Sequence, residues 1–160
     1  MAVDMFIKIG DLKGESKDQK HPGEIDVLAW SWGMSQAGST HHGTGGGAGK
    51  VNVQDLSLTK YIDKSSTNLM MACCMGTHYK VANLVVRKAG DKPLEYLKLK
   101  LEDVIITSVS TGGSGGEDRL TENVTLNFAK FTAEYVPQKA DGSGDASTPM
   151  GYDMQENKKI

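Results

Sequence analysis

The feature that most constrains the fold is a pair of long segments with alternating side chains, joined by a glycine-rich loop. In the first segment, 94–109, Leu97, Leu99 and Leu101 alternate with Lys98, Lys100 and Glu102. In the second, 120–128, apolar residues alternate with threonine and asparagine. A period of two gives a β-strand one dry face and one wet face. With the loop 111–118 between them, the two segments predict a long β-hairpin.

Shorter segments predict further strands. Apolar or alternating stretches occur at 3–9, 25–32, 50–58 and 79–88, and a final short element is expected within 150–160. In the segment 25–32, the large side chains Leu28, Trp30 and Trp32 alternate with smaller ones. We therefore expect a heavy face and a light face on this strand, with Ser31 on the light one.

One helix interrupts the strands. Candidate N-caps at 63–66 precede Leu69, Ala72 and Cys73, whose spacing is helical, and Gly76 is expected to end the helix. So many strands with a lone helix predict a mainly β fold, a barrel or sandwich of two antiparallel sheets with one flanking α-helix. A length of 160 residues fits a single domain, 1–160. Flexible loops are expected at about 37–49, 111–118 and 139–149.

Composition and charge exclude several classes of function. Eighteen basic and twenty acidic residues give a formal charge of −2, which does not attract nucleic acid. No apolar run approaches the length of a membrane span, so no direct membrane insertion is expected. The N-terminus lacks the features of a signal peptide, and the two cysteines, Cys73 and Cys74, are adjacent, which disfavours a local disulfide. We expect a chain that folds in a reducing cytoplasm.

Ser114 lies in a string, 112–116, that fits the G-x-S-x-G pattern of the nucleophile elbow. The elbow requires a helix after the serine, whereas the alternation at 120–128 predicts a strand. No histidine follows Ser114, because the last one is His78. A hairpin loop is favoured, and a small serine hydrolase remains as an alternative.

Two other patterns suggest ligand sites without fulfilling them. The loop that ends at Gly49-Lys50 lacks the first glycine and the final hydroxyl residue of a phosphate-binding loop. His41 and His42, with the cysteines, lack zinc-ligand spacing. We expect no cofactor and no metal.

Trp30 and Trp32 present a second alternative. Two indole rings on one strand face can form a stacking platform for a sugar or a base. No basic patch accompanies them, so a place in the core is favoured over a ligand-binding β module.

Several blocks of the chain together resemble the haemolysin-coregulated protein (Hcp) family, the tube subunit of the type VI secretion system. The resembling segments are 1–9, 25–33, 49–57, 60–65 and, most specifically, 108–124. The chain differs from the family pattern at His41-His42, at Cys73-Cys74 and at Tyr152, where tryptophan is usual.

The resemblance implies a structural protein and not an enzyme. Copies would form hexameric rings that stack into a tube, bind effector proteins in the lumen, and meet a contractile sheath and a spike protein of the valine-glycine-repeat type. Export would start from the bacterial cytoplasm and use the type VI system without a cleaved signal peptide. Glycine-punctuated strands with open edges agree with pairing between copies.

The resemblance also implies roles for particular residues. Ser31 is expected to face the lumen, and Gly90 and Asn157 are expected near the contacts between stacked rings. The loop that holds Ser114, Glu117 and Asp118 is expected to take part in assembly.

Overall fold

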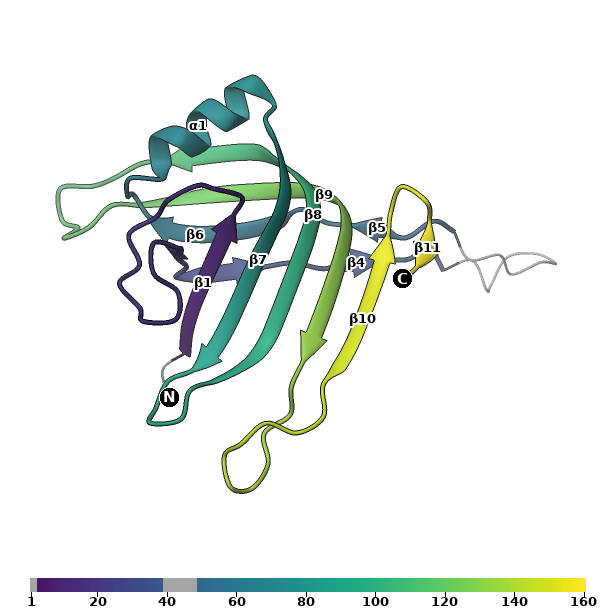
Figure 1. The fold of residues 1–160 in the computed structure, drawn as a ribbon. Helices are drawn as coiled ribbons and strands as arrows, with labels where there is room; N and C mark the ends of the chain where they lie inside the picture. Colours follow the sequence, from purple (N-terminus) through teal and green to yellow (C-terminus); the bar gives the residue numbers. More distant parts are fainter. Residues whose placement is uncertain (1–2, 39–48) are drawn as a thin grey trace.

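A computed structural model describes residues 3–38 and 49–160 of the chain. Eleven strands and one helix occur in this part: β1 (Val3–Ile9), β2 (Ile25–Asp26), β3 (Ala29–Ser31), β4 (Met34–Ser35), β5 (Asn52–Val53), β6 (Leu56–Tyr61), α1 (Ser66–Met75), β7 (His78–Lys88), β8 (Leu94–Thr111), β9 (Thr121–Tyr135), β10 (Thr148–Asp153) and β11 (Lys158–Lys159). Antiparallel sheets and a single flanking helix confirm the predicted fold class, although the described strands do not close into a barrel (Figure 1).

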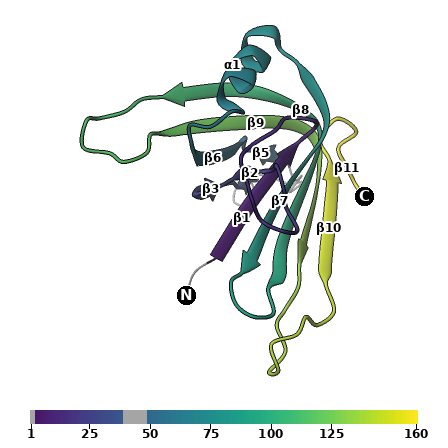
Figure 2. The same cartoon turned by 60° about the vertical axis from the view of Figure 1, so that its left-hand side comes forward.

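The predicted hairpin, β8 and β9, is long enough to take part in two layers. Its open end belongs to the lower sheet, in which the strand order is β11-β10-β9-β8-β7-β1-β2. Its closed end continues into an upper layer, in which β9 pairs with β6 and β6 pairs with β3. Figure 2 shows the two layers diverging, with the hairpin extending to one side and β10 running upward from the loop at the bottom. A separate sheet contains β4 and β5.

Two irregularities in β8 accompany the change of layer. Asp103 has a φ of 54°, which is uncommon for a residue other than glycine. The register of β8 against β9 then shifts between Ile106 and Ser108. Bulges of this kind bend a strand and increase its twist. The bent hairpin brings the inner faces of both layers together around one apolar core.

Strand alternation supplies that core, as the sequence predicts. The buried side chains include Ile7, Ile9, Leu84, Leu99, Leu101 and Phe131 from the lower sheet, Leu56, Leu58, Val124 and Leu126 from the upper layer, and Leu69 and Ala72 from α1. Burying a side chain of this size contributes about 1.5–3 kcal/mol. Burial on this scale makes the packing of the two layers the main source of stability.

A buried ion pair fixes the beginning of α1 to the upper layer. The Lys60 ammonium lies 2.5 Å from Glu122 Oε1, and their side chains are 1% and 0% exposed. The Ser66 hydroxyl donates to the same carboxylate oxygen at 2.7 Å. The helix ends at Gly76, whose φ of 63° suits glycine, so the predicted helix is confirmed.

The prediction of one strand over 25–32 is wrong. The chain forms β2 and β3 instead, because it moves from one layer to the other at Val27 and Leu28. The Val27 amide donates to Met5 in the lower sheet at 3.0 Å, whereas the Leu28 amide donates to Thr59 in the upper layer at 2.8 Å. The heavy and light faces are therefore interrupted, with Val27 buried and Leu28 39% exposed. The segment predicted as a strand at 50–58 is likewise divided into β5 and β6.

An arginine attaches the segment between β1 and β2 to the outer face of the lower sheet. Arg87 donates two hydrogen bonds to the Asp18 carboxylate, at 2.7 and 3.0 Å, and a third to Asp4 at 3.0 Å. This interaction with Arg87 lowers the pKa of Asp18 to about 2. Asp18 is therefore ionised throughout the neutral range.

A histidine makes the second attachment of the same segment. The His21 ring stacks on Phe6 with centroids 4.6 Å apart, and its two nitrogens lie 2.9 Å from Glu24 and 2.7 Å from Glu95. Burial lowers the pKa of His21, but the hydrogen bonds with the two glutamates outweigh it, so the net pKa is raised. The segment thus covers Phe6 by a charge-dependent contact.

Candidate functional site

The exposed face of the upper layer is built from small uncharged side chains. Register places them in two rows across β3, β6, β9 and β8: Ser31, Ser57, Thr125 and Ser108 in one, and Ala29, Thr59, Asn123 and Ser110 in the other. We call these eight residues the hydroxyl face. All are exposed or half-buried. No side chain in either row carries a charge.

Hydrogen bonds within each row link side chains of neighbouring strands on this face. Ser108 and Thr125 share a bond of 2.6 Å, and Thr59 donates to Asn123 at 2.8 Å. Lys60 and Glu122 of these strands are buried on the inner side, and other charged groups lie towards the strand ends. Asp55 accepts from Asn127 at 2.8 Å near one end, and Arg119 lies 3.7 Å over the Tyr61 ring near the other. The face therefore offers a partner hydrogen bonds to uncharged groups across all four strands, and no ion pairs.

The upper layer has two free edges within the described part of the chain. On one side β3 pairs only with β6. On the other, the part of β8 after Ile105 pairs only with β9, and α1 packs beside it. Unpaired strand edges are templates for pairing with another chain. The layer is thus suited to being extended on both sides.

The residues predicted for function lie in three different regions. Ser31 is exposed on β3, within the hydroxyl face. Gly90 lies in the turn after β7, with a φ of 144°, and Asn157 lies in the turn after β10, with a φ of 55°. Because β7 and β10 run antiparallel across the lower sheet, these turns lie at opposite ends of it.

The loop with Ser114, Glu117 and Asp118 joins β8 to β9 and is exposed. The Ser114 hydroxyl accepts from the Gly116 amide at 3.4 Å, and the Ser114 carbonyl accepts from Glu117 at 3.2 Å. Strand β9 follows the loop, where a nucleophile elbow would need a helix. The geometry favours a hairpin turn over a hydrolase site.

The two tryptophans are half-buried and pack against the core. Trp32 meets Phe131 edge-on with centroids 4.8 Å apart, and its ring nitrogen donates to Gln54 at 2.9 Å. Because the Trp32 ring packs against Phe131 and its nitrogen is already hydrogen-bonded, the ring is not free to act as a stacking platform for a ligand. This packing does not favour the ligand-binding alternative.

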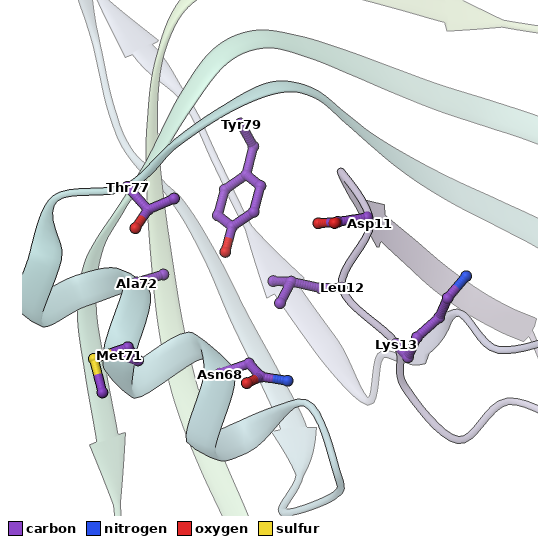
Figure 3. Close-up of a pocket in the computed structure, with 8 residues that line it drawn as sticks. All are labelled: Asp11, Leu12, Lys13, Asn68, Met71, Ala72, Thr77 and Tyr79. Carbon is purple, nitrogen blue, oxygen red and sulfur yellow. The ribbon is translucent and has the colours of Figure 1, made fainter.

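The cavity between α1 and the end of β1 is shown in Figure 3. It has a volume of about 360 Å³ and includes Asp11, Tyr79 and Met71 in its lining. Burial and the charge of Asp11 raise the pKa of Tyr79, so its hydroxyl stays protonated. Within this lining we find no pairing of a nucleophile with a base.

Residues 3–38 and 49–160 contain neither a metal-binding cluster nor a membrane-spanning helix. No group of three histidine, cysteine, aspartate or glutamate side chains there is placed to hold a metal. The described helix is too short and insufficiently apolar to cross a membrane. Both cysteines are free, and His41 and His42 lie outside the described residues.

Sequence reasoning found Ser31 but missed most of the hydroxyl face. The polar alternation in β9 was visible in the sequence, and the same alternation occurs at Ser57 and Thr59 of β6. What the sequence did not give was the register that sets these rows side by side. An uncharged face with a free strand edge on each side defines a β-sheet protein whose sheet can be extended by further strands.

Comparison with known proteins agrees with this class. The family model described as type VI secretion system effector, Hcp, matches residues 6–135. The chain is 67% identical to the protein hcp1 of Pseudomonas aeruginosa over 159 residues, which covers 98% of each chain. This chain therefore belongs to the Hcp family of type VI secretion proteins.

Solved structures give the same result. A structure described as a type six secretion system protein superposes with a TM-score of 0.93 at 33% identity, covering 99% of this chain and 100% of that one. The crystal structure of Hcp1 from Salmonella typhimurium superposes with a TM-score of 0.83 at 43% identity, covering all of both chains. The protein is a secreted structural tube protein and not an enzyme, as predicted.

Proposed function

We propose that copies of this chain close side by side into hexameric rings, which stack into a tube with the hydroxyl face around the lumen. The observation that carries the proposal is that this uncharged face spans four strands and ends at a free edge on each side. Pairing of the β3 edge with the β8 edge of the next copy would continue the sheet around a ring. A head-to-tail contact gives a closed ring when the rotation from each copy to the next adds up to a full turn.

The chemistry of the face suits a lumen that holds effector proteins. A charged lining would bind cargo of opposite charge and repel the rest, and a large apolar lining would hold unfolded segments. Small hydroxyl and amide groups avoid both. We propose that effectors are bound in this lumen and stabilised there, with Ser31 among the residues that face them.

Stacking of rings involves the two ends of the lower sheet. Gly90 and Asn157 lie in turns at opposite ends, which supports contact of one turn with the other in the next ring. The exposed loop with Ser114, Glu117 and Asp118 projects beyond the upper layer and would add to assembly (Figure 1). In this proposal the whole chain, 1–160, acts as one domain.

Membership of the family supports the remaining partners. We propose that the tube lies inside a contractile sheath, is capped by a spike protein of the valine-glycine-repeat type, and leaves the bacterial cytoplasm without a cleaved signal peptide. Direct contacts with sheath and spike would be made outside the hydroxyl face.

The test combines the mass of the purified protein in solution with a substitution in the lumen. We expect a mass of six chains, and annular particles by negative-stain electron microscopy. Ser31→Gln should preserve the ring but reduce retention of effectors in cells, because a longer side chain enters the hole. Thr132→Gln, paired with Lys100 on the outer face of the lower sheet, is the matched control. A monomer would contradict the ring, and unchanged retention in Ser31→Gln would contradict the placement of Ser31.

A further inference from the structure

Helix α1 has an unusual exposed surface. Its ten residues carry no charge, and Met71 and Met75 are 62% and 72% exposed. Met70 and Cys74 are exposed beside them. We call these four residues the methionine face. Figure 3 shows Met71 on the helix, turned away from Tyr79. A surface helix normally presents charged or polar residues to water, and exposed methionines are typical of binding surfaces.

A second apolar surface lies on the inner face of the lower sheet, near the free ends of its strands. Leu97 of β8 pairs with Tyr135 of β9, and Met150 of β10 lies on the same face, one row further in. Tyr135 and Met150 are 48% and 47% exposed. Met34 of β4 is 45% exposed and shares with Met150 the lining of a cavity of about 370 Å³. We call Leu97, Tyr135, Met150 and Met34 the apolar shelf.

The two surfaces lie on different sides of the molecule. Figure 1 shows α1 at the top and the arrowhead of β9 at the bottom. A contact between two unlike surfaces of one chain is the head-to-tail kind that builds rings. The methionine face and the apolar shelf are both uncharged and exposed, so each would lose contact with water when they meet.

Each of the two surfaces lies near a free strand edge, and this position indicates that the partner of the methionine face is a second copy of the chain. Helix α1 packs on β8, beside one free edge of the upper layer. The shelf includes Met34 of β4, which closely follows β3, the strand at the other free edge. In a ring closed through the β3 and β8 edges, the shelf of one copy would approach α1 of its neighbour. We propose that the methionine face of each copy docks on the apolar shelf of the next copy in the ring.

This contact rests on the proposed ring and explains how it is stabilised. Two short strand edges supply a few hydrogen bonds but little buried area. Stable and specific interfaces bury about 1,200–2,000 Å² in total. The helix and the shelf add the apolar contact that the edges lack.

Crosslinking tests the contact, because Cys74 already lies in the methionine face. Tyr135→Cys and Met150→Cys each place a partner thiol on the shelf. With dilute single rings and a short bismaleimide, we expect a ladder on a denaturing gel that stops at the hexamer. Lys100→Cys, on the outer face of the same sheet, should give no ladder. Adding Cys74→Ser to Met150→Cys should abolish it.

The outcomes separate this contact from the ring itself. Hexamers by mass that give no ladder with either shelf variant would overturn the docking and leave the ring intact. A ladder that continues beyond the hexamer would place the contact between rings and would also overturn it. A folded monomer by mass would overturn the ring, and the docking with it.

A second variant tests the contact without added thiols. The double substitution Met71→Glu and Met75→Glu should shift the concentration at which rings dissociate at least tenfold, while circular dichroism stays unchanged. Lys100→Glu, on the outer face of the lower sheet, changes the net charge by the same two units; it is the control and should leave the rings intact. Equal ring stability in all three proteins would contradict the docking.

Discussion

Strands β8 and β9 present two outward faces of opposite character. In the lower sheet, β8 turns Glu95, Lys98 and Lys100 outward, and Lys98 lies 3.6 Å from Glu95. In the upper layer, the same strand turns Ser108 and Ser110 outward. Solubility depends on the charge of the whole surface, so it does not explain why one face is charged and the other is not. The difference agrees with the proposed ring, in which the charged face would lie outside and the hydroxyl face would border the lumen.

The largest effect is expected where the upper layer holds its buried charges. Glu122→Ala removes the nearer of the two carboxylates that pair with the buried Lys60 ammonium and leaves only Asp63, at 3.1 Å. Removing one member of a buried pair costs about 3–5 kcal/mol. Urea unfolding should show a loss of this size. In the lower sheet, Lys98→Ala breaks only a surface pair and should cost less than about 1 kcal/mol. Equal losses would contradict the distinction between the two layers.

Acid should act on the lower sheet through Asp18. Its pKa falls from 3.8 to about 2 because of Arg87, so its contribution to stability is complete above pH 3.8 and disappears as the pH falls through about 2. Asp18→Asn should flatten the stability profile in this window, as followed by thermal unfolding. A profile identical to that of the parent would show that the attachment adds nothing to stability.

A rise in pH should weaken the second attachment of the segment between β1 and β2, which His21 makes. The pKa of His21 is raised above 6.5, so its contribution is complete below pH 6.5 and disappears as the pH rises through the raised value. Hydrogen exchange of residues 10–24 should therefore accelerate on this rise. His21→Gln should remove the pH dependence, and its persistence would assign it to another group.

The smallest effect on stability is expected on the hydroxyl face. Ser110→Lys is exposed and breaks no packing, so the free energy of unfolding should change by no more than about 0.5 kcal/mol. The same substitution places a charge in the proposed lumen, where it should alter which effectors are retained. Lys98→Ser, the reverse exchange on the lower sheet, should leave retention unchanged.

Local patterns were enough to predict the hairpin and α1. Alternation along β8 and β9 reports which side of each strand is dry, and Gly76 marks the end of the helix. The break between β2 and β3 was not predictable, because it depends on Val27 and Leu28 bonding to different layers. Such partners are far away in sequence.

The candidate site was likewise predictable only in part. Ser31 was assigned to a light strand face, and it is exposed there; its position in the lumen stays a prediction. The burial of Lys60 was not foreseen, although it continues the inward alternation of Leu56 and Leu58, because lysine is rarely found inside without a partner. That partner, Glu122, comes from β9.

An electron-microscopy map of the assembled particle tests the central claim most directly. We expect a central hole bordered by the strands that carry Ser31, Thr125 and Ser108, with Lys98 and Lys100 facing away from it. A hole bordered by the charged face of the lower sheet would contradict the claim.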